Sequence, residues 1–266
     1  CRHSKALCRH PAVTGKTVVP KTLKPSFVLQ GGERIIWKKM ERPLLVPRPL
    51  DITIIHKDND ILVVDKPPGL VVHPGAGTEA VTLVEGLLME QKLPAGDDPV
   101  RPGIVHRLDK ETSGVMVVAL TSAAMEDLKQ QFAVRQVVKR YLAVVDGVIA
   151  EEEGMIDSPV GRDIKRPWRM AVVTEGRSSQ TEFRVLKRSV KQTLLLIMPK
   201  SGRTHQIRVH MSHIGHPVHG DALYGGTKAT RLFLHSWRLA IFHPQTKEWM
   251  KFTSPVPLEF KELCAA

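Results

Sequence analysis

The sequence predicts an α+β fold built mainly on a largely antiparallel sheet. Three observations lead to this prediction: many short apolar runs rich in β-branched residues, turn signals between them, and only a few stretches with helical periodicity. The chain has 266 residues, enough to bury a substantial core without disulfides or metals. With 42% hydrophobic and 25% charged residues, its composition excludes wholesale disorder.

The N-terminal part is predicted to be a small module. Residues 15–37 alternate polar and apolar side chains, with glycines at turn positions, which predicts two or three short strands. Residues 41–49 contain Pro43, Pro47 and Pro49 and show little periodicity, as linkers do. We therefore expect a first segment at 1–39, a proline-rich linker at 40–50 and the main domain at 51–266.

The main domain is predicted to begin with a hairpin, because two β-branched runs, 52–55 and 61–64, flank a polar stretch. A Pro-Pro-Gly turn follows at 67–69, and a polar stretch at 93–102 is predicted to be a surface loop. The remaining predicted strands are 115–120, 141–145, 181–186, 193–198, 233–242 and 249–252, and the predicted helices are 81–89, 122–132 with Ser122 as its N-cap, and 204–213. Strands 181–186 and 193–198 are expected to be neighbours.

Charge and cysteine content restrict the classes of partner and compartment. The formal net charge of +12 and the pI of about 9.8 fit a polyanionic partner such as a nucleic acid. The longest apolar run, 115–120, is far too short for a transmembrane helix, and no early apolar run resembles a secretory signal. The three cysteines lie near the chain ends and cannot frame a disulfide scaffold, so we expect a reducing compartment.

The segment 106–114 places a carboxylate at the entrance to a buried strand. Asp109 lies close to Arg107 and Lys110, an arrangement that suits an ionised carboxylate. At a loop-to-strand junction such a group can be held rigidly and still face a cleft. Both a catalytic residue and an ion pair that holds the loop fit this pattern.

The segment 201–211 supplies an arginine without a local partner. If the helix begins at Thr204, Arg208 lies in its first turn, where the helix dipole disfavours a cation. A carboxylate from elsewhere would stabilise it, and Asp109 is the candidate. The next segment, 215–225, contains glycines and a proline that predict a tightly shaped loop.

Histidines and cysteines raise the question of a metal. Cys-Arg-His occurs at 1–3 and again at 8–10, but this spacing fits no usual zinc finger. The five histidines between 205 and 219 lack the motif of a helical i, i+4 pair with a nearby carboxylate. Solvated or RNA-facing histidines explain them, and we predict neither a metal site nor a cofactor.

Three motifs together resemble the RluA-type RNA pseudouridine synthases. They are Val-Asp-Lys-Pro-Pro-Gly-Leu at 64–70, His-Arg-Leu-Asp-Lys-Glu-Thr-Ser-Gly at 106–114 and Gly-Arg-Thr-His-Gln-Ile-Arg-Val-His-Met at 202–211, and residues 215–225 match the family's next stretch. The resemblance runs from about Ile52 to the C-terminus and is strongest to the RluD type, which acts on large-subunit ribosomal RNA. It implies a pseudouridine synthase fold with a central active-site cleft. Residues 15–37 resemble part of an S4-type RNA-binding module, whose basic helices upstream are mostly absent or degenerate.

The resemblance also implies roles for individual residues. Asp109 matches the catalytic aspartate, Tyr141 the active-site tyrosine and Arg208 the arginine that pairs with the aspartate. Arg107 matches the residue that enters the space left by a flipped-out nucleotide. Five further residues are expected to bind substrate: His106, Arg203, Ile207 as a pocket wall or helix core, and Lys66 and Lys110 as contacts to backbone phosphates.

The implied reaction explains these residue types. Converting uridine to pseudouridine breaks the glycosidic bond and rejoins the base through carbon, so no atoms are added and no cofactor is required. The reaction needs a carboxylate held ionised by a cation, and a target nucleotide flipped out at a cost of a few kcal/mol. Arg208 provides the cation, and Tyr141 offers a ring that can stack on the base. The sequence leaves open whether Asp109 attacks the sugar, attacks the base or removes a sugar proton.

Two alternative functions use the same residues. A non-catalytic RNA-binding or ribosome-assembly factor would use the basic cleft, although binding alone needs no buried carboxylate facing RNA. A metal-dependent phosphoesterase would use His106, Asp109, His205 and His210. We expect instead an RNA pseudouridine synthase, without a cofactor, that acts on large-subunit ribosomal RNA. We also expect a monomer in the cytoplasm, or in an organellar matrix or stroma if the source is eukaryotic, with no membrane partner.

Overall fold

The computed structural model describes residues 11–14, 34–37, 45–75, 78–96 and 98–260. The chain divides into two units, Cys1–Pro43 and Leu44–Ala266, and each is described by itself. In the first unit, β1 (Pro11–Thr14) pairs antiparallel with β2 (Arg34–Trp37). The rest of the predicted S4-like segment, the Cys-Arg-His repeats and the first part of the predicted linker lie outside the described residues, so these predictions stand as they were made.

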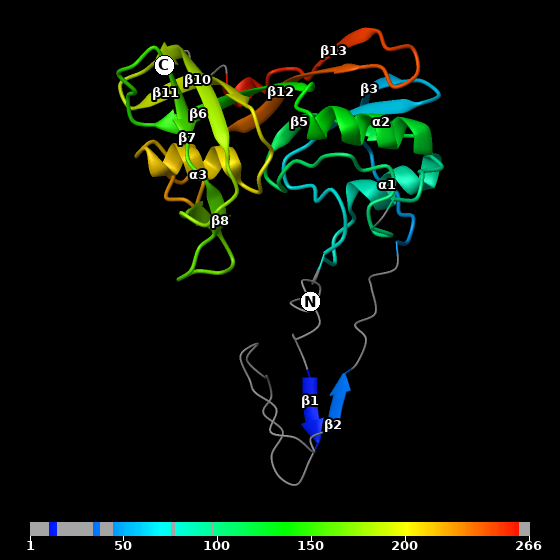
Figure 1. Ribbon diagram of the computed structural model, residues 1–266. Helices are drawn as coiled ribbons and strands as arrows, with labels where there is room; N and C mark the ends of the chain where they lie inside the picture. Colours follow the sequence, from blue (N-terminus) through cyan, green and yellow to red (C-terminus); the bar gives the residue numbers. More distant parts are fainter. Residues whose placement is uncertain (1–10, 15–33, 38–44, 76–77, 97, 261–266) are drawn as a thin grey trace. The chain divides into compact units, whose positions relative to one another are not determined.

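A nine-stranded mixed sheet forms the centre of the second unit (Figure 1). Its strand order is β3-β4-β5-β12-β6-β11-β10-β7, with β13 paired to β12. All neighbouring strands run antiparallel except β5 and β12, so the predicted largely antiparallel sheet is confirmed. The strands are β3 (Thr53–Lys57), β4 (Ile61–Lys66), β5 (Ser113–Ala119), β6 (Val138–Asp146), β7 (Glu153–Asp157), β10 (Gln180–Arg188), β11 (Gln192–Pro199), β12 (Leu234–Phe242) and β13 (Trp249–Thr253).

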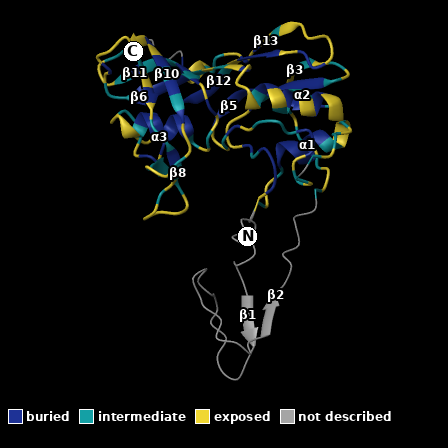
Figure 2. Cartoon of the chain, viewed as in Figure 1, coloured by how far each residue is buried: buried dark blue, intermediate teal, exposed yellow. Residues whose placement is uncertain are grey.

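Helices cover this sheet on both faces. Alternate residues of β4 and β5 point to opposite sides, where one set packs with α1 (Leu83–Glu90) and the other with α2 (Ser122–Ala133). Because both faces are covered, every residue of β5 is buried (Figure 2). In the other half of the sheet, α3 (Gln206–His213) packs its apolar residues against β6, β10 and β11. None of the helices in the described ranges is long and apolar enough to cross a membrane.

Two helices begin two residues later than predicted, and a third has a different N-cap. Helix α1 begins at Leu83 and not at Val81. Helix α2 begins at Ser122 as predicted, but the Thr121 hydroxyl accepts a hydrogen bond from the Ala124 amide, so Thr121 is the N-cap and not Ser122. Helix α3 begins at Gln206 and not at Thr204, because His205 adopts a left-handed backbone conformation with φ 56°. Arg208 is therefore the third residue of α3.

In the second unit three strands were not predicted, namely β7 and the separate hairpin of β8 (Val160–Arg162) and β9 (Met170–Val172). They have only three to five residues, and burial does not alternate along β8 or β9. Burial does alternate along β7, but Met155 is on its exposed face and Gly154 on its inner face, so its apolar side chains do not. Apolar residues with period two are what reveals a strand in sequence, so these segments lacked the signal.

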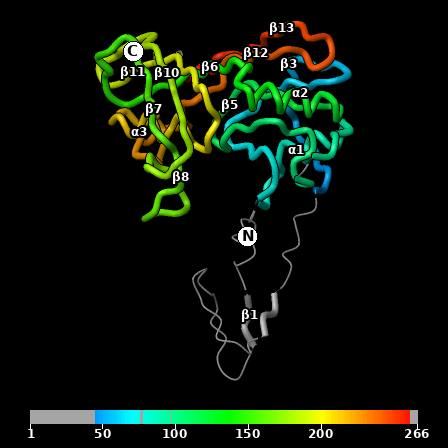
Figure 3. Tube along the Cα trace, viewed as in Figure 1, coloured from blue at the N-terminus to red at the C-terminus, as the bar shows by residue number. Residues whose placement is uncertain are grey.

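The parallel contact between β5 and β12 joins the two halves of the sheet. Figure 3 shows the late strand β12 beside β5 and β6. Only two residue pairs form the β5–β12 ladder, His235 with Ser113 and Ser236 with Gly114. Gly114 has φ +114°, and a Cβ there would lie 2.2 Å from the carbonyl oxygen of Ser236. Glycine is therefore required at this junction, directly after the loop that carries Asp109.

Candidate active site

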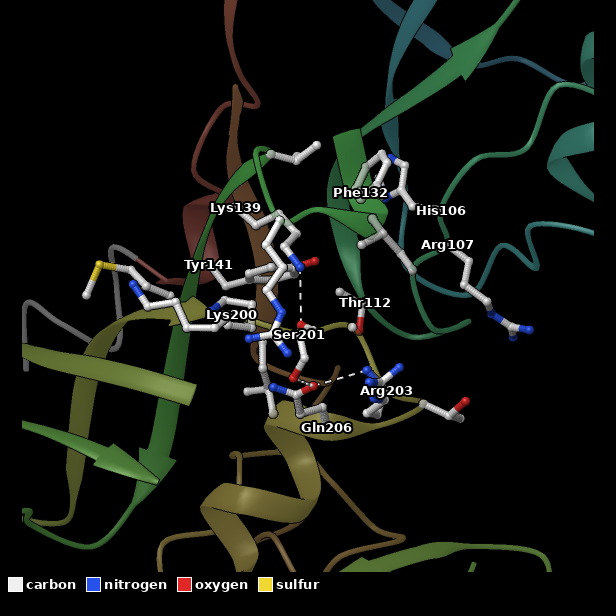
Figure 4. A pocket seen from close by; sticks show the side chains of 18 of the residues that line it. His106, Arg107, Thr112, Phe132, Lys139, Tyr141, Lys200, Ser201, Arg203 and Gln206 are labelled. Carbon is white, nitrogen blue, oxygen red and sulfur yellow. Dashed lines mark hydrogen bonds between the residues drawn. The ribbon is translucent and has the colours of Figure 1, made fainter. Parts of the chain in front are cut away.

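A cavity of about 960 Å³ lies over the junction of the two sheet halves (Figure 4). Its walls come from the segments 105–112, 129–141, 180–182 and 198–208, together with Leu234. Eight of the lining residues are lysine or arginine, and only Asp109 and Glu182 are acidic. The cavity is therefore strongly cationic and suits a polyanionic ligand.

Lys66 fixes the loop that carries Asp109. The Lys66 side chain is fully buried, and its Nζ donates hydrogen bonds to the carbonyl oxygens of Pro67 at 2.8 Å, Leu70 at 2.9 Å and Lys110 at 3.0 Å. Burial lowers the pKa of this ammonium to about 7. The predicted phosphate contact by Lys66 is thus wrong, because the group is enclosed and bonded to backbone. It positions the loop that carries Asp109 instead.

Arg208 connects two carboxylates. Its Nη1 donates to Asp109 Oδ2 at 3.3 Å, so the sequence correctly predicted this pair. Its Nε and Nη2 donate to the two oxygens of Asp221 at 2.7 and 2.9 Å. Burial opposes the charge of Arg208, but the hydrogen bonds and negative charge of Asp221, with that of Asp109, outweigh it and raise the guanidinium pKa.

Asp221 is a site residue that the sequence analysis missed. Its side chain is completely enclosed, and its Oδ1 also accepts hydrogen bonds from the amides of Leu223 and Tyr224. The preceding Gly220 has φ +80°, and a Cβ there would lie 1.8 Å from the Arg231 carbonyl oxygen, so the loop passes close to backbone. The tight loop predicted from its glycines therefore serves to aim Asp221 at Arg208.

Tyr141 lies on β6, opposite Ser236 of β12 and Ile197 of β11. Its ring packs against the core beneath the cavity and also lines the cavity. Burial raises the pKa of the phenol to about 12, although a hydrogen bond with Ser236 opposes this effect. The hydroxyl is therefore protonated at neutral pH, and the ring is available to stack against a planar ligand.

His205 and Tyr224 extend the site on the far side of Asp109. The His205 Nε2 lies 3.9 Å from Asp109 Oδ2, and its Nδ1 lies 2.8 Å from the Tyr224 hydroxyl. That hydroxyl accepts a hydrogen bond from the Met170 amide at 3.0 Å. The ring of Tyr224 also lies 5.1 Å from the guanidinium carbon of Arg208. Burial lowers the pKa of His205, so it faces Asp109 chiefly as neutral imidazole.

Comparison with known proteins assigns this arrangement to a family. Residues 60–213 match the family model described as RNA pseudouridylate synthase. The chain belongs to the RNA pseudouridine synthases. It is 41% identical to the "uncharacterized RNA pseudouridine synthase YlyB" of Bacillus subtilis, over 94% of this chain and 84% of that protein. It is 39% identical to a "ribosomal large subunit pseudouridine synthase D" of Xanthomonas campestris, over 92% and 79% respectively.

A solved structure confirms the fold of the synthase. The human RNA pseudouridylate synthase domain containing 1 superimposes with a TM-score of 0.65 at 29% identity, covering 82% of this chain and 87% of that one. The predicted pseudouridine synthase fold and the predicted enzyme class are therefore confirmed. The alternative of a binding-only protein is not supported by this membership.

The surroundings of His106 do not suit a charged substrate ligand. Its Nε2 accepts a hydrogen bond from the Val117 amide at 3.0 Å, and its ring stacks on Phe132 at 4.6 Å. Burial lowers the pKa of His106 to about 3, with a further contribution from the charge of Lys139. The synthase thus keeps this histidine neutral, and it presents an aromatic wall to the cavity.

The other predicted substrate ligands take varied positions. Arg107 is exposed, and its Nη1 lies 3.2 Å from His73 Nε2. Arg203 lines the cavity, as does Ile207, which is buried and also belongs to the core. Lys110 points to solvent, 3.8 Å from Glu111, and is not part of the cavity wall. The structure therefore brings Arg203 and Ile207 to Asp109 but not Lys110.

The ligand set of the alternative phosphoesterase is not assembled. His210 bonds to the Thr181 hydroxyl and the Ser158 carbonyl, and His106 is engaged by Val117, so neither converges on Asp109. Within the described residues, the one group with metal-ligand spacing is Asp58, Asp60 and His243, which do not line the cavity.

Proposed function

We propose that this synthase converts uridine to pseudouridine in large-subunit ribosomal RNA, with Asp109 as the essential carboxylate. The observation that carries the proposal is the position of Asp109: a partly exposed carboxylate in a cationic cavity, hydrogen-bonded to the buried Arg208. The relatives named ribosomal large subunit pseudouridine synthase D support this choice of RNA. We also take the enzyme to act as a monomer in the cytoplasm.

In this proposal, the three catalytic residues divide the reaction between them. Asp109 acts on the flipped-out nucleotide while the C1′–N1 bond breaks and the C1′–C5 bond forms. C5 then loses a proton and N1 gains one, so the composition of the nucleotide is unchanged. Arg208 orients the Asp109 carboxylate through a charge-assisted hydrogen bond. Tyr141 supports the detached base with its ring, because its buried hydroxyl stays neutral.

In this proposal, residues that line the cavity bind the rest of the substrate. Arg107 extends along one wall away from Tyr141 (Figure 4), where it can occupy the space that the flipped nucleotide leaves. His106 and Ile207 form apolar or aromatic surfaces around the base, and Arg203 faces the backbone. Lys110, at the exposed rim of the loop, is available to a more distant phosphate.

The proposal is tested by pseudouridine formation on large-subunit ribosomal RNA that lacks the modification. The intact enzyme and Asp109→Asn are compared, both with a chelator present. We expect product from the intact enzyme only, with a rate loss of at least about 10³-fold for the variant and RNA binding retained. Product formed equally by both proteins would refute the role of Asp109. A transcript-wide map that shows product only in other RNAs would refute the choice of substrate.

A further inference from the structure

We propose that Lys139, Arg135 and Arg203 form a site for one backbone phosphodiester of the RNA, next to the target nucleotide. This inference rests on the proposed function for its ligand, because it assumes an RNA in the cavity. None of the three was assigned such a site by the resemblance, except that Arg203 was expected to touch substrate in general.

Lys139 shares a strand face with Tyr141. The two residues are two positions apart on β6, so their side chains point to the same side of the sheet, about 7 Å apart along the strand. Figure 4 shows both side chains reaching into the cavity. The Lys139 Nζ donates a hydrogen bond to the Ser201 carbonyl oxygen at 3.2 Å, which fixes the ammonium at the wall. A ligand whose base stacks on Tyr141 therefore brings an adjacent group of its chain to Lys139.

The three cations lie together without a counter-charge. Burial, together with the charges of Arg135 and Arg203, lowers the pKa of Lys139 to about 8. Over the described part of the chain, no carboxylate forms an ion pair with any of the three. The two acidic residues of the cavity are already paired, Asp109 with Arg208 and Glu182 with Lys200 at 2.7 Å. Clustered like charges are unfavourable in the free protein, and a bound anion relieves their repulsion.

Arg135 lies in the turn that ends α2. Its φ of 62° belongs to the C-terminal cap of that helix, in which the Gln136 amide donates a hydrogen bond to the Gln131 carbonyl oxygen at 2.9 Å. This turn brings Arg135 to the cavity wall beside Lys139. Two guanidinium groups and an ammonium match the two free oxygens of a phosphodiester, which accept hydrogen bonds from several donors.

A phosphodiester is favoured over other anions because of the neighbouring site. Phosphate contacts fix the register of a nucleic acid on a protein, and base contacts are made elsewhere. A cationic group carried two residues before Tyr141, on the same face of β6, can fix the backbone while the target base lies between Tyr141 and Asp109. The three residues thus select the register of the RNA and take no part in bond breaking.

The test uses the full chain and four variants. Lys139→Met removes the charge, Lys139→Arg retains it with a group that stays protonated, and Arg203→Gln removes a second cation. Lys251→Met, on β13 and outside the cavity lining, is the matched control for a lost surface charge. RNA affinity is measured against salt concentration, and KM and kcat are measured between pH 6.5 and 9.

We expect Lys139→Met and Arg203→Gln to weaken RNA binding about tenfold at low salt and to reduce the salt slope by about 0.7 each, with kcat little changed. In the intact enzyme KM should rise above pH 8, because Lys139 loses its proton there. The charged and titratable groups that face it are Arg135, Arg203 and His106, and the pKa of His106, about 3, lies below this range. Lys139→Arg should remove that rise and keep the affinity.

Three results would overturn the phosphate site. They are a salt slope for Lys139→Met equal to that of Lys251→Met, the same pH dependence of KM in the intact enzyme and Lys139→Arg, or a loss confined to kcat. Should Lys139→Met fail to fold, Arg203→Gln and Lys139→Arg supply the same two readouts. The binding experiment needs no turnover, so a failure of the proposed function would appear separately, as absence of product from the intact enzyme.

Discussion

Arg208 gives Asp221 two hydrogen bonds, at 2.7 and 2.9 Å, and gives Asp109 a single longer one, at 3.3 Å. The buried guanidinium is thus held by a carboxylate that is enclosed, and only its remaining nitrogen faces the carboxylate in the cavity. These three hydrogen bonds hold Arg208 rigidly in the first turn of α3, where the helix dipole alone would disfavour a positive charge. Asp109 stays oriented without being locked into a bidentate pair.

Asp221→Asn should therefore impair catalysis, although the Asp221 side chain is enclosed and acts through Arg208. The variant keeps the shape of the side chain but removes the charge that holds Arg208, so Arg208 is free to engage Asp109 more closely. We expect kcat to fall at least about tenfold and the free energy of unfolding to fall by about 3 kcal/mol. Turnover and urea denaturation measure the two effects. Glu153→Gln, which breaks an exposed pair with Arg184, should change stability by less than about 1 kcal/mol. Equal behaviour of the two variants would contradict the role of Asp221.

Lys66→Met should loosen the catalytic loop. Three carbonyl oxygens lose their shared donor, including that of Lys110 beside Asp109. We expect a loss of about 2–3 kcal/mol in unfolding free energy and a lower kcat, measured by denaturation and single-turnover kinetics. Lys110→Met, which removes an exposed ammonium on the same loop, should leave stability unchanged. If Lys66→Met reduced only RNA affinity, Lys66 would be a phosphate ligand after all.

Acid should destabilise the enzyme through two buried neutral histidines. Burial lowers the pKa of His106 to about 3, and burial together with the charge of Arg231 lowers that of His235 to about 4. Because the folded pKa values lie below the unfolded value of about 6.5, the unfolded chain binds more protons between pH 4 and 6.5. Stability is therefore lost as pH falls through that window, by up to about 1.4 kcal/mol per pH unit for each histidine.

The pH effect is measured by urea denaturation between pH 4.5 and 7. His235→Gln keeps hydrogen-bonding atoms near Ser113 and Ser254 but does not titrate, so the dependence on pH should become shallower by about one proton. His213→Gln, at an exposed position, should leave the dependence unchanged. The same slope in all three proteins would show that other groups cause the acid loss.

Gly114→Ala should open the junction between the two sheet halves. The new methyl group would overlap the Ser236 backbone, and the residue would hold an unfavourable φ of +114°. We expect a loss of about 3 kcal/mol or more and no detectable product. Gly225→Ala separates these two causes, because it has φ +89° with nothing within 4 Å, and should cost only about 1–2 kcal/mol. Thermal unfolding of both variants decides between them.

The sequence predicted the sheet and the central pair of the site, because both have clear signals. Alternating β-branched runs marked the main strands, and the motif around Asp109 and Arg208 identified two residues 99 positions apart that are 3.3 Å from each other. Asp221 was missed although its loop was recognised, since glycines predict the shape of a loop but not where its side chains point. The isolated cation of α3 was the signal that a second carboxylate was needed.

Lys66 and Lys139 show the limits of residue type as a guide. A lysine is almost never fully buried, so Lys66 was expected at the surface, and only its three backbone partners explain its enclosure. Lys139 received no role, because the predicted strand, 141–145, did not reach it. In the structure β6 begins at Val138, so Lys139 lies two positions before Tyr141 on the same face. The start of the strand, which sequence patterns locate poorly, thus decided whether this lysine could be found.

The position of β12 has a consequence for how the enzyme is made. This strand is synthesised about a hundred residues after β5 and β6, yet it lies between them in the sheet. Until residues 234–242 are available, the two halves of the sheet share no ladder, and Asp109 has no fixed relation to Arg208 or Tyr141. Each half can collapse on its own helices during synthesis, since their cores are separate. During synthesis the two halves of the sheet, and with them the two walls of the cavity, are therefore joined through β12 only after both have been made.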